Sequence, residues 1–266
     1  MAKGTYISEN LTQSQMDVML MLDEYELDIF TLNDIRNMLP DPSGNANEIM
    51  ENLVHKKIVS RIERGKYSRS NFRDEKVIGC FLVPDGAISY WSALNLYGLT
   101  EQFSNTIFIQ TTKIKKDKMV FGVNYQFVTI SKFKRDGILK KGYGNHSYSI
   151  TDIEKTIVDC FDLPKYSGGY AELIRAFAKA KLSSEKMIRY CKVTKNTAAT
   201  KRMGFLAELL DKQGMKIFIR FALQQVKEAN NPFDPQGKNI GKYERKWRLR
   251  MNISRDQLLD ITNKLY

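Results

Sequence analysis

Residues 31–69 constrain the fold more than any other stretch of this chain. Two short amphipathic segments flank a Pro/Gly-rich turn at 40–44, and a basic hairpin sequence follows at 59–69 (Val-Ser-Arg-Ile-Glu-Arg-Gly-Lys-Tyr-Ser-Arg). Capped helices followed directly by a hairpin with glycine at its tip are typical of a winged helix-turn-helix. We therefore predict a winged helix-turn-helix DNA-binding domain over residues 1–73.

Three capping signals mark the helices of this domain. Thr12 with Gln15, Thr31 with Asp34, and the segment that begins at Asn45 each place a capping side chain before an apolar stripe. The helix expected after Asn45 is apolar on one face and polar on the other. Because the third helix of such a domain enters the major groove, we expect base-edge contacts from four polar residues: Asn45, Asn47, Asn52 and Lys56.

The hairpin supplies cations in addition. Arginine and lysine suit phosphates, and a guanidinium also fits a narrow minor groove. We expect this role for Arg61, Arg64, Lys66 and Arg69, with Tyr67 packed back against the helices. Some three-helix units with a basic hairpin bind protein instead, and the residue pattern alone leaves that reading open.

The rest of the chain, residues 74–266, is predicted to be a mixed α/β domain with a subdivision near residue 166, which makes the whole an α+β protein. Apolar and β-branched runs predict strands at 106–112, 125–130 and 143–150, with a late strand at 243–253. Helical spacing predicts helices at 89–97, 151–161, 169–182, 184–190, 196–213 and 215–229, and a final helix after residue 254.

The charge balance points to a polyanionic partner. The 266 residues carry 42 Lys and Arg against 30 Asp and Glu, a formal net charge of +12, which favours nucleic acid, an anionic membrane surface or an acidic protein. No apolar run approaches the roughly 20 residues of a membrane span, and the N-terminus lacks the apolar core of a signal peptide. We expect a cytoplasmic protein without a membrane partner.

No familiar catalytic pattern accompanies this charge. Only two histidines are present, and the three cysteines lack the paired spacing of a zinc site or a disulfide framework. Four acids at 152, 154, 159 and 162 resemble a metal cluster, but helix-start electrostatics account for two of them. We predict no enzymatic activity, no metal and no cofactor.

Basic residues also gather in two later segments, where we expect a surface for a partner that is either DNA or an acidic protein. The first group comprises Lys186, Arg189, Lys192, Lys195, Lys201 and Arg202. The second comprises Lys242, Arg245, Lys246, Arg248 and Arg250.

Five short motifs, in order along the chain, make it resemble the AbiEi-type antitoxins, which are transcriptional regulators of abortive-infection (viral defence) toxin–antitoxin operons. The wing sequence at 64–67 is similar to R-G-x-Y, and residues 92–100 are similar to S-A-L followed by G-L-T. Residues 151–160 resemble D-x-E-[RK]-T-[IL]-x-D, residues 202–206 resemble R-L-G-[YF]-L, and residues 247–252 resemble W-x-L-x-[VI]-N. Met203 and Met251 depart from these patterns, conservatively for packing.

The resemblance implies two functions. The N-terminal domain would bind inverted repeats in operator DNA and repress its own operon. The C-terminal domain would neutralise a nucleotidyltransferase-like toxin, in many systems without a stable complex. Two other readings stay open at this point: a ligand-responsive regulator with a sensor or dimerisation domain, and a nucleic-acid enzyme with a winged-helix targeting domain.

Overall fold

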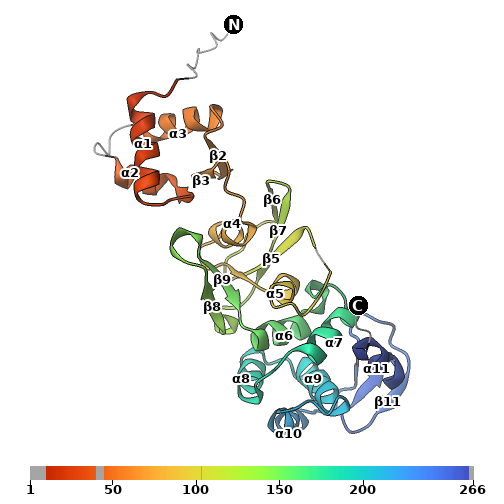
Figure 1. The fold of residues 1–266 in the computed structure, drawn as a ribbon. Coiled ribbons are helices and arrows are strands. Elements are labelled where there is room, and N and C mark those ends of the chain that lie inside the picture. The colour runs from red at the N-terminus through yellow and green to blue at the C-terminus, as the bar shows by residue number, and fades with distance from the viewer. Residues whose placement is uncertain (1–9, 40–44, 103, 264–266) are drawn as a thin grey trace. The chain divides into compact units, whose positions relative to one another are not determined.

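The structure is a computed structural model that describes residues 10–39, 45–102 and 104–263, and it divides into two compact units (Figure 1). The first unit runs to Pro84 and also includes Gly142–Tyr148, and the second contains the remainder. The turn predicted at 40–44 and the first nine residues lie outside the described residues. The molecule is a mixed α+β protein.

The first unit combines short helices with a small antiparallel sheet of order β1-β3-β2. Its elements, from red to orange in Figure 1, are α1 (Gln13–Glu24), β1 (Ile29–Thr31), α2 (Leu32–Met38), α3 (Ala46–His55), β2 (Val59–Glu63), β3 (Lys66–Arg69) and α4 (Glu75–Phe81). The core joins α1, α2 and α3 to the sheet, and Tyr67 is buried with its ring centroid 6.2 Å from that of Phe30. The prediction that Tyr67 packs inward is confirmed.

Local hydrogen bonds explain where the helices of this unit begin. Thr12 and Gln15 form a reciprocal capping box at α1, and Thr31 and Asp34 form another at α2. The Asn45 side chain accepts from the backbone N–H of Glu48 at the start of α3. Such caps satisfy N–H groups that have no partner within the helix, as the sequence predicted.

The unit boundary differs from the one expected at residue 73. Helix α4 belongs to the first unit, where the Lys66 ammonium donates to the Leu82 carbonyl oxygen at 2.6 Å, just beyond the helix. Residues 142–148 return to this unit from much later in the sequence. The Asn145 side chain accepts from the N–H groups of Asp28 and Ile29 and donates to the Ile29 carbonyl, each at 2.9 Å. Asn145 therefore continues the hydrogen bonding of edge strand β1.

The second unit is built on a six-stranded mixed sheet of order β6-β7-β5-β4-β9-β8. The strands are β4 (Ala87–Ile88), β5 (Thr106–Thr111), β6 (Lys118–Val120), β7 (Val123–Thr129), β8 (Ile138–Lys141) and β9 (Tyr148–Thr151). Strands β5 and β7 run parallel, with Ile109 opposite Phe127. They occupy nearly the stretches predicted from their β-branched and aromatic residues.

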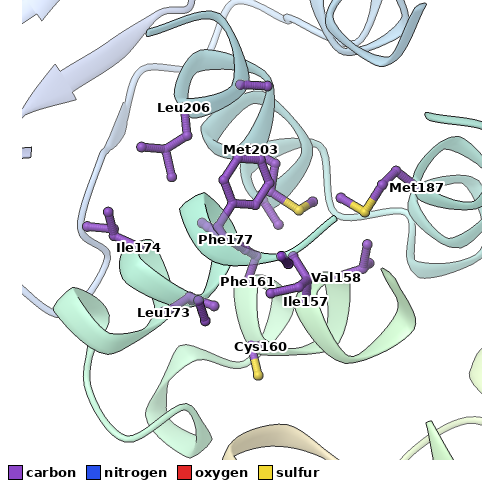
Figure 2. Close-up of a cluster of buried hydrophobic side chains, with 14 of the residues drawn as sticks. Ile157, Val158, Cys160, Phe161, Leu173, Ile174, Phe177, Met187, Met203 and Leu206 are labelled. Carbon is purple, nitrogen blue, oxygen red and sulfur yellow. The ribbon is translucent and has the colours of Figure 1, made fainter. Parts of the chain in front are cut away.

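Helices make up most of the remaining second unit, and their apolar faces form one core. They are α5 (Tyr90–Leu96), α6 (Ile153–Asp162), α7 (Tyr170–Lys179), α8 (Ser184–Thr194), α9 (Thr197–Leu209), α10 (Lys216–Gln224) and α11 (Arg255–Asn263). Figure 2 shows Phe161 of α6, Phe177 of α7 and Met203 of α9 converging, with the two phenylalanine rings edge to face at 5.7 Å. No helix among the described residues has the length and apolar character needed to cross a bilayer.

Two predicted strands are shorter than expected. Residues 143–147 form a 3₁₀ turn and its flanks, so only Tyr148–Thr151 is strand. The single strand expected at 243–253 is instead two, β11 (Lys242–Glu244) and β12 (Leu249–Met251), which pair with each other, and β12 also pairs with β10 (Asn231–Pro232). A turn separates them because Arg248 adopts a left-handed conformation, φ +47°, beside the buried Trp247.

Three of the family-like motifs occupy packing positions. Gly204 of α9 lies under the Trp247 ring, where an added Cβ would approach within 2.5 Å, so the two C-terminal motifs meet there. The Thr100 hydroxyl donates to Glu172 at 2.9 Å inside the second unit. These residues stabilise the fold and do not by themselves mark a binding surface.

Candidate nucleic-acid interface

The first unit has a groove of about 1030 Å³ between α2, α3 and the β2–β3 hairpin. We call it the first-unit groove. Polar and charged side chains from all three elements line it, including Asn33, Arg36, Asn47, Glu51, Arg61 and Arg64. The arrangement gives one surface both amides, which can donate to and accept from a base edge, and guanidinium groups, which can hold phosphates.

Arg64 is the most available cation of the groove. It stands at the tip of the hairpin beside Gly65, whose φ of +72° suits the tight turn. The side chain is exposed, and no hydrogen bond or ion pair joins it to any other described residue. An unpaired, exposed guanidinium can approach a polyanion without first breaking an internal contact.

Arg61 is held differently, on the wall of the same groove. Its guanidinium forms an ion pair with Glu51 of α3 and lies 5.6 Å from the Tyr67 ring centroid. The hydrogen bond to Glu51 raises the pKa of Arg61 above its usual value, against a smaller opposing effect of burial. Glu51 thus orients Arg61 and also places one negative charge in a mostly cationic groove.

Of the eight residues predicted to contact DNA, the groove brings together Asn47, Arg61, Arg64 and Lys66. The Lys66 ammonium is turned toward the carbonyl of Leu82. The lining also includes Arg36 and Asn33 of α2, which the sequence reasoning missed. Their signal was an exposed basic and polar face on α2, next to the helix expected to enter the groove.

The other four predicted residues make contacts within the first unit. The Lys56 ammonium donates to the Asn10 carbonyl at 2.5 Å and to Gln15 at 2.7 Å. Arg69 donates to the Leu27 carbonyl and pairs with Asp23 at 2.7 Å. Asn45 caps α3, and Asn52 is half-buried on the same helix.

The side chains of the basic group at 186–202 in the second unit have partners within that unit, but only two of the six are paired with acids. Lys186 pairs with Asp152 at 3.1 Å and Glu154 at 3.4 Å, and Arg189 pairs with Asp136 at 2.6 Å. The ammonium groups of Lys192 and Lys195 lie over the rings of Phe221 and Phe133, at 5.8 and 5.9 Å from the centroids.

Lys201 and Arg202 are buried, so the exposed basic surface is narrower than the sequence predicted. Lys201 donates to the carbonyls of Ala229 and Arg248 at 2.8 and 2.9 Å, and Arg202 donates to the Pro232 carbonyl at 3.0 Å. Burial, followed by repulsion from the two neighbouring arginines, lowers the pKa of Lys201 to about 8. Both side chains form hydrogen bonds with backbone carbonyls of the segment that follows α10.

The C-terminal basic group also contains both residues with partners and residues without them among the described residues. Lys246 pairs with Glu208, Arg250 donates to the Asn239 carbonyl at 2.6 Å, and Arg248 donates to the Glu228 carbonyl at 2.7 Å. Lys242 and Arg245 are exposed, and neither has an ion pair or a hydrogen bond from its side chain within the described part of the chain.

The acidic residues around α6 form an internal network. Asp152 caps the helix through the Lys155 N–H and accepts from the Tyr190 hydroxyl at 2.7 Å, and the buried Lys155 pairs with the buried Asp159. Burial raises the pKa of Asp159, and Lys155 opposes that rise. Across the described residues no group of three or more His, Cys, Asp or Glu side chains is arranged to hold a metal ion.

A comparison with known proteins bears on the fold. A crystal structure of the protein RV2827C from Mycobacterium tuberculosis is similar over 97% of both chains, with a TM-score of 0.69 at 14% sequence identity. No model of a known protein family matches the chain, and no curated protein sequence matches it. At 14% identity this likeness concerns the mixed α+β fold alone.

Proposed function

We propose that the first unit is a winged helix-turn-helix that binds double-stranded DNA, and that the protein is a transcriptional repressor. The observation that carries the proposal is the first-unit groove, whose lining combines the amide of Asn47 with the exposed Arg36 and with Arg64, which has no partner among the described residues. Guanidinium groups would fix the protein on phosphates or in the minor groove, and the amide would contact a base edge.

The order of elements supports this proposal. Helix, strand, helix, helix and a two-stranded hairpin follow one another, with the early strand β1 paired to β3, the second arm of the hairpin. In a winged helix-turn-helix, the third helix of such a unit enters the major groove and the hairpin is the wing. Here α3 would present Asn47, and the hairpin would present Arg61 and Arg64.

The resemblance to AbiEi-type antitoxins supports a second role. We propose that the repressor acts on operator inverted repeats of its own operon, and that the second unit is an antitoxin toward a nucleotidyltransferase-like toxin. Motif residues such as Gly204 and Lys155 lie in packed interiors. They would preserve the antitoxin fold, whereas exposed residues such as Lys242 and Arg245 would be available to a partner.

The decisive test is equilibrium binding of fluorescent DNA from upstream of the gene, against scrambled DNA, over a salt series. We expect the upstream DNA to bind more tightly and both affinities to fall with salt as counterions are released. Arg64→Ala should weaken binding by about 1–3 kcal/mol if the guanidinium contacts a groove edge.

Arg220→Ala is the matched control, because Arg220 is an exposed arginine of α10, outside the groove. It should bind the upstream DNA as the wild type does. Equal affinity for both DNAs, or an Arg64→Ala protein with unchanged affinity and salt dependence, would refute the proposed interface.

A further inference from the structure

A second cavity, of about 460 Å³, lies in the C-terminal part of the second unit and has no part in the proposed DNA interface. We call it the hairpin pocket, and its lining residues are Asn230, Tyr243, Glu244, Arg245 and Arg248. Small-molecule sites commonly have volumes of roughly 300–1,000 Å³, so the hairpin pocket is large enough for a ligand of nucleotide size.

Positive charge around the hairpin pocket is not cancelled by carboxylates. The Arg248 guanidinium donates to the Glu228 carbonyl, and the Lys201 ammonium donates to the Arg248 carbonyl, so both cations bond neutral oxygens. Arg245 is exposed and has no partner among the residues that the structure describes. The one acid of the lining, Glu244, is paired with Arg255 at 2.7 Å. This balance favours an anionic ligand.

The backbone at Arg248 is left-handed, as it is at six other non-glycine residues of the described chain. Its φ of +47° lies in the left-handed region, where glycine is unstrained and a residue with a Cβ is not. Non-glycine residues in such conformations gather at ligand-binding and active sites, where the side chain is required. The turn between β11 and β12 thus has an arginine where the backbone favours glycine.

An aromatic ring completes the lining. Tyr243 is 53% exposed, and Arg250 fixes it by a hydrogen bond to its hydroxyl, with the guanidinium carbon 4.6 Å from the ring centroid. A fixed, exposed tyrosine is a platform on which a nucleobase can stack. The Asn230 amide, which comes just before β10, also lines the pocket and can donate to and accept from a base edge.

We infer that the hairpin pocket binds a phosphorylated nucleoside. Arg245 and Arg248 hold the phosphate, because guanidinium groups form paired, charge-assisted hydrogen bonds with phosphate oxygens. Tyr243 stacks on the base, and Asn230 contacts its edge. The inference does not depend on the DNA-binding proposal, since no residue of the first unit takes part.

The test is calorimetric titration of the full-length protein with ATP, GTP, inorganic triphosphate and adenosine. We expect at least one nucleotide to bind more tightly than triphosphate or adenosine, since only a nucleotide uses both the arginines and the ring. Arg245→Gln should weaken that binding by about tenfold or more. Arg220→Gln removes one exposed arginine of the same unit outside the pocket and should leave binding unchanged.

Arg248→Gly is the second variant, because it removes a phosphate ligand while the backbone retains a conformation that glycine adopts freely. It should weaken nucleotide binding while the thermal unfolding profile stays that of the wild type. A titration with a 5′-phosphorylated single-stranded oligonucleotide distinguishes the source of the ligand. Tighter binding than the free nucleotide that is lost in Arg245→Gln assigns the site to a strand end, and weaker binding assigns it to free nucleotides.

Three results would overturn the inference. The first is no binding by any nucleotide or by the oligonucleotide. The second is triphosphate that binds as tightly as ATP, which would remove the role of Tyr243. The third is an equal loss of binding in Arg245→Gln and Arg220→Gln, which would mean diffuse attraction to a basic protein.

Discussion

The first-unit groove and the α6 network of the second unit contain the same kinds of charged residue, but in the groove most of these residues are exposed and in the network they are buried and paired. In the groove, Arg64 and Arg36 are exposed, and Arg64 has no partner among the described residues. Around α6, Lys155 is wholly buried and paired with Asp159. Charge that is already satisfied stabilises a fold, and charge that is unsatisfied is available to a ligand. The residue type of a charged side chain therefore does not tell which of the two roles it has. Its partners do.

The largest effect is expected from Lys155→Ala, which tests the structural side of this comparison. Removal of one member of a buried ion pair leaves the Asp159 carboxylate without its cation, which should lower the free energy of unfolding by about 3–5 kcal/mol. Urea denaturation measures the change. Replacement of both partners, in Lys155→Met with Asp159→Leu, should restore part of the loss, because it also removes the stranded charge.

Arg189→Gln is the control for that experiment. The Arg189–Asp136 pair lies at the surface, with the Arg189 side chain 64% exposed, and such pairs contribute little. The urea midpoint of Arg189→Gln should stay at the wild-type value. A Lys155→Ala protein as stable as Arg189→Gln would contradict the assignment of the α6 network to stability.

A smaller effect is expected in the first-unit groove from Glu51→Gln. This change removes the one acid that pairs with Arg61, so the guanidinium is released and the repulsion of phosphates falls. DNA affinity at low salt should rise by about 0.5–1 kcal/mol, the size of an exposed charge interaction. Glu24→Gln, an exposed acid of α1 outside the groove lining, should leave the affinity unchanged. Weaker binding by Glu51→Gln would mean that the orientation of Arg61 matters more than its release.

A dependence of stability on pH is expected from Lys201, the buried cation whose ammonium donates to two backbone carbonyls. Its pKa is about 8 in the folded protein against an ordinary 10.5. Between these values the unfolded chain binds more protons than the folded one, so the free energy of unfolding rises with pH. The wild type should gain stability relative to Lys201→Met from about pH 8 to pH 10.5.

Urea denaturation at pH 7, 9 and 10 measures this difference. Lys216→Met, at an exposed position of α10, should show the same pH dependence as the wild type. A constant difference between the wild type and Lys201→Met across the pH range would show that Lys201 keeps its proton throughout.

Local signals predicted much of the fold. Capping side chains at Thr12, Thr31 and Asn45 lie next to the N–H groups that they satisfy, so a window of four residues contains the whole interaction. Strands β5 and β7 have β-branched and aromatic runs of the expected length. Such features depend on residues that are neighbours in the sequence, so they can be predicted from the sequence alone.

Features set by distant residues were not predicted. The return of Asn145 to Asp28 joins positions 117 residues apart, and nothing near either residue signals it. The division of the basic residues into paired and unpaired ones depends on partners such as Asp136 for Arg189, 53 residues away. The turn at Arg248 was missed because its left-handed backbone occurs at an arginine, where a glycine would have signalled it.

The heptapeptide Gly142–Tyr148 has a consequence for how this protein can be divided or recombined. The chain leaves the first unit after Pro84, returns for these seven residues and leaves again. An excised fragment that ends at Pro84 would leave the N–H groups of Asp28 and Ile29 without the Asn145 oxygen, and Asp28 without His146, which lies 2.6 Å away. A single cut in the chain therefore cannot separate the two units intact, and any exchange of the first unit between related proteins has to bring residues 142–148 with it.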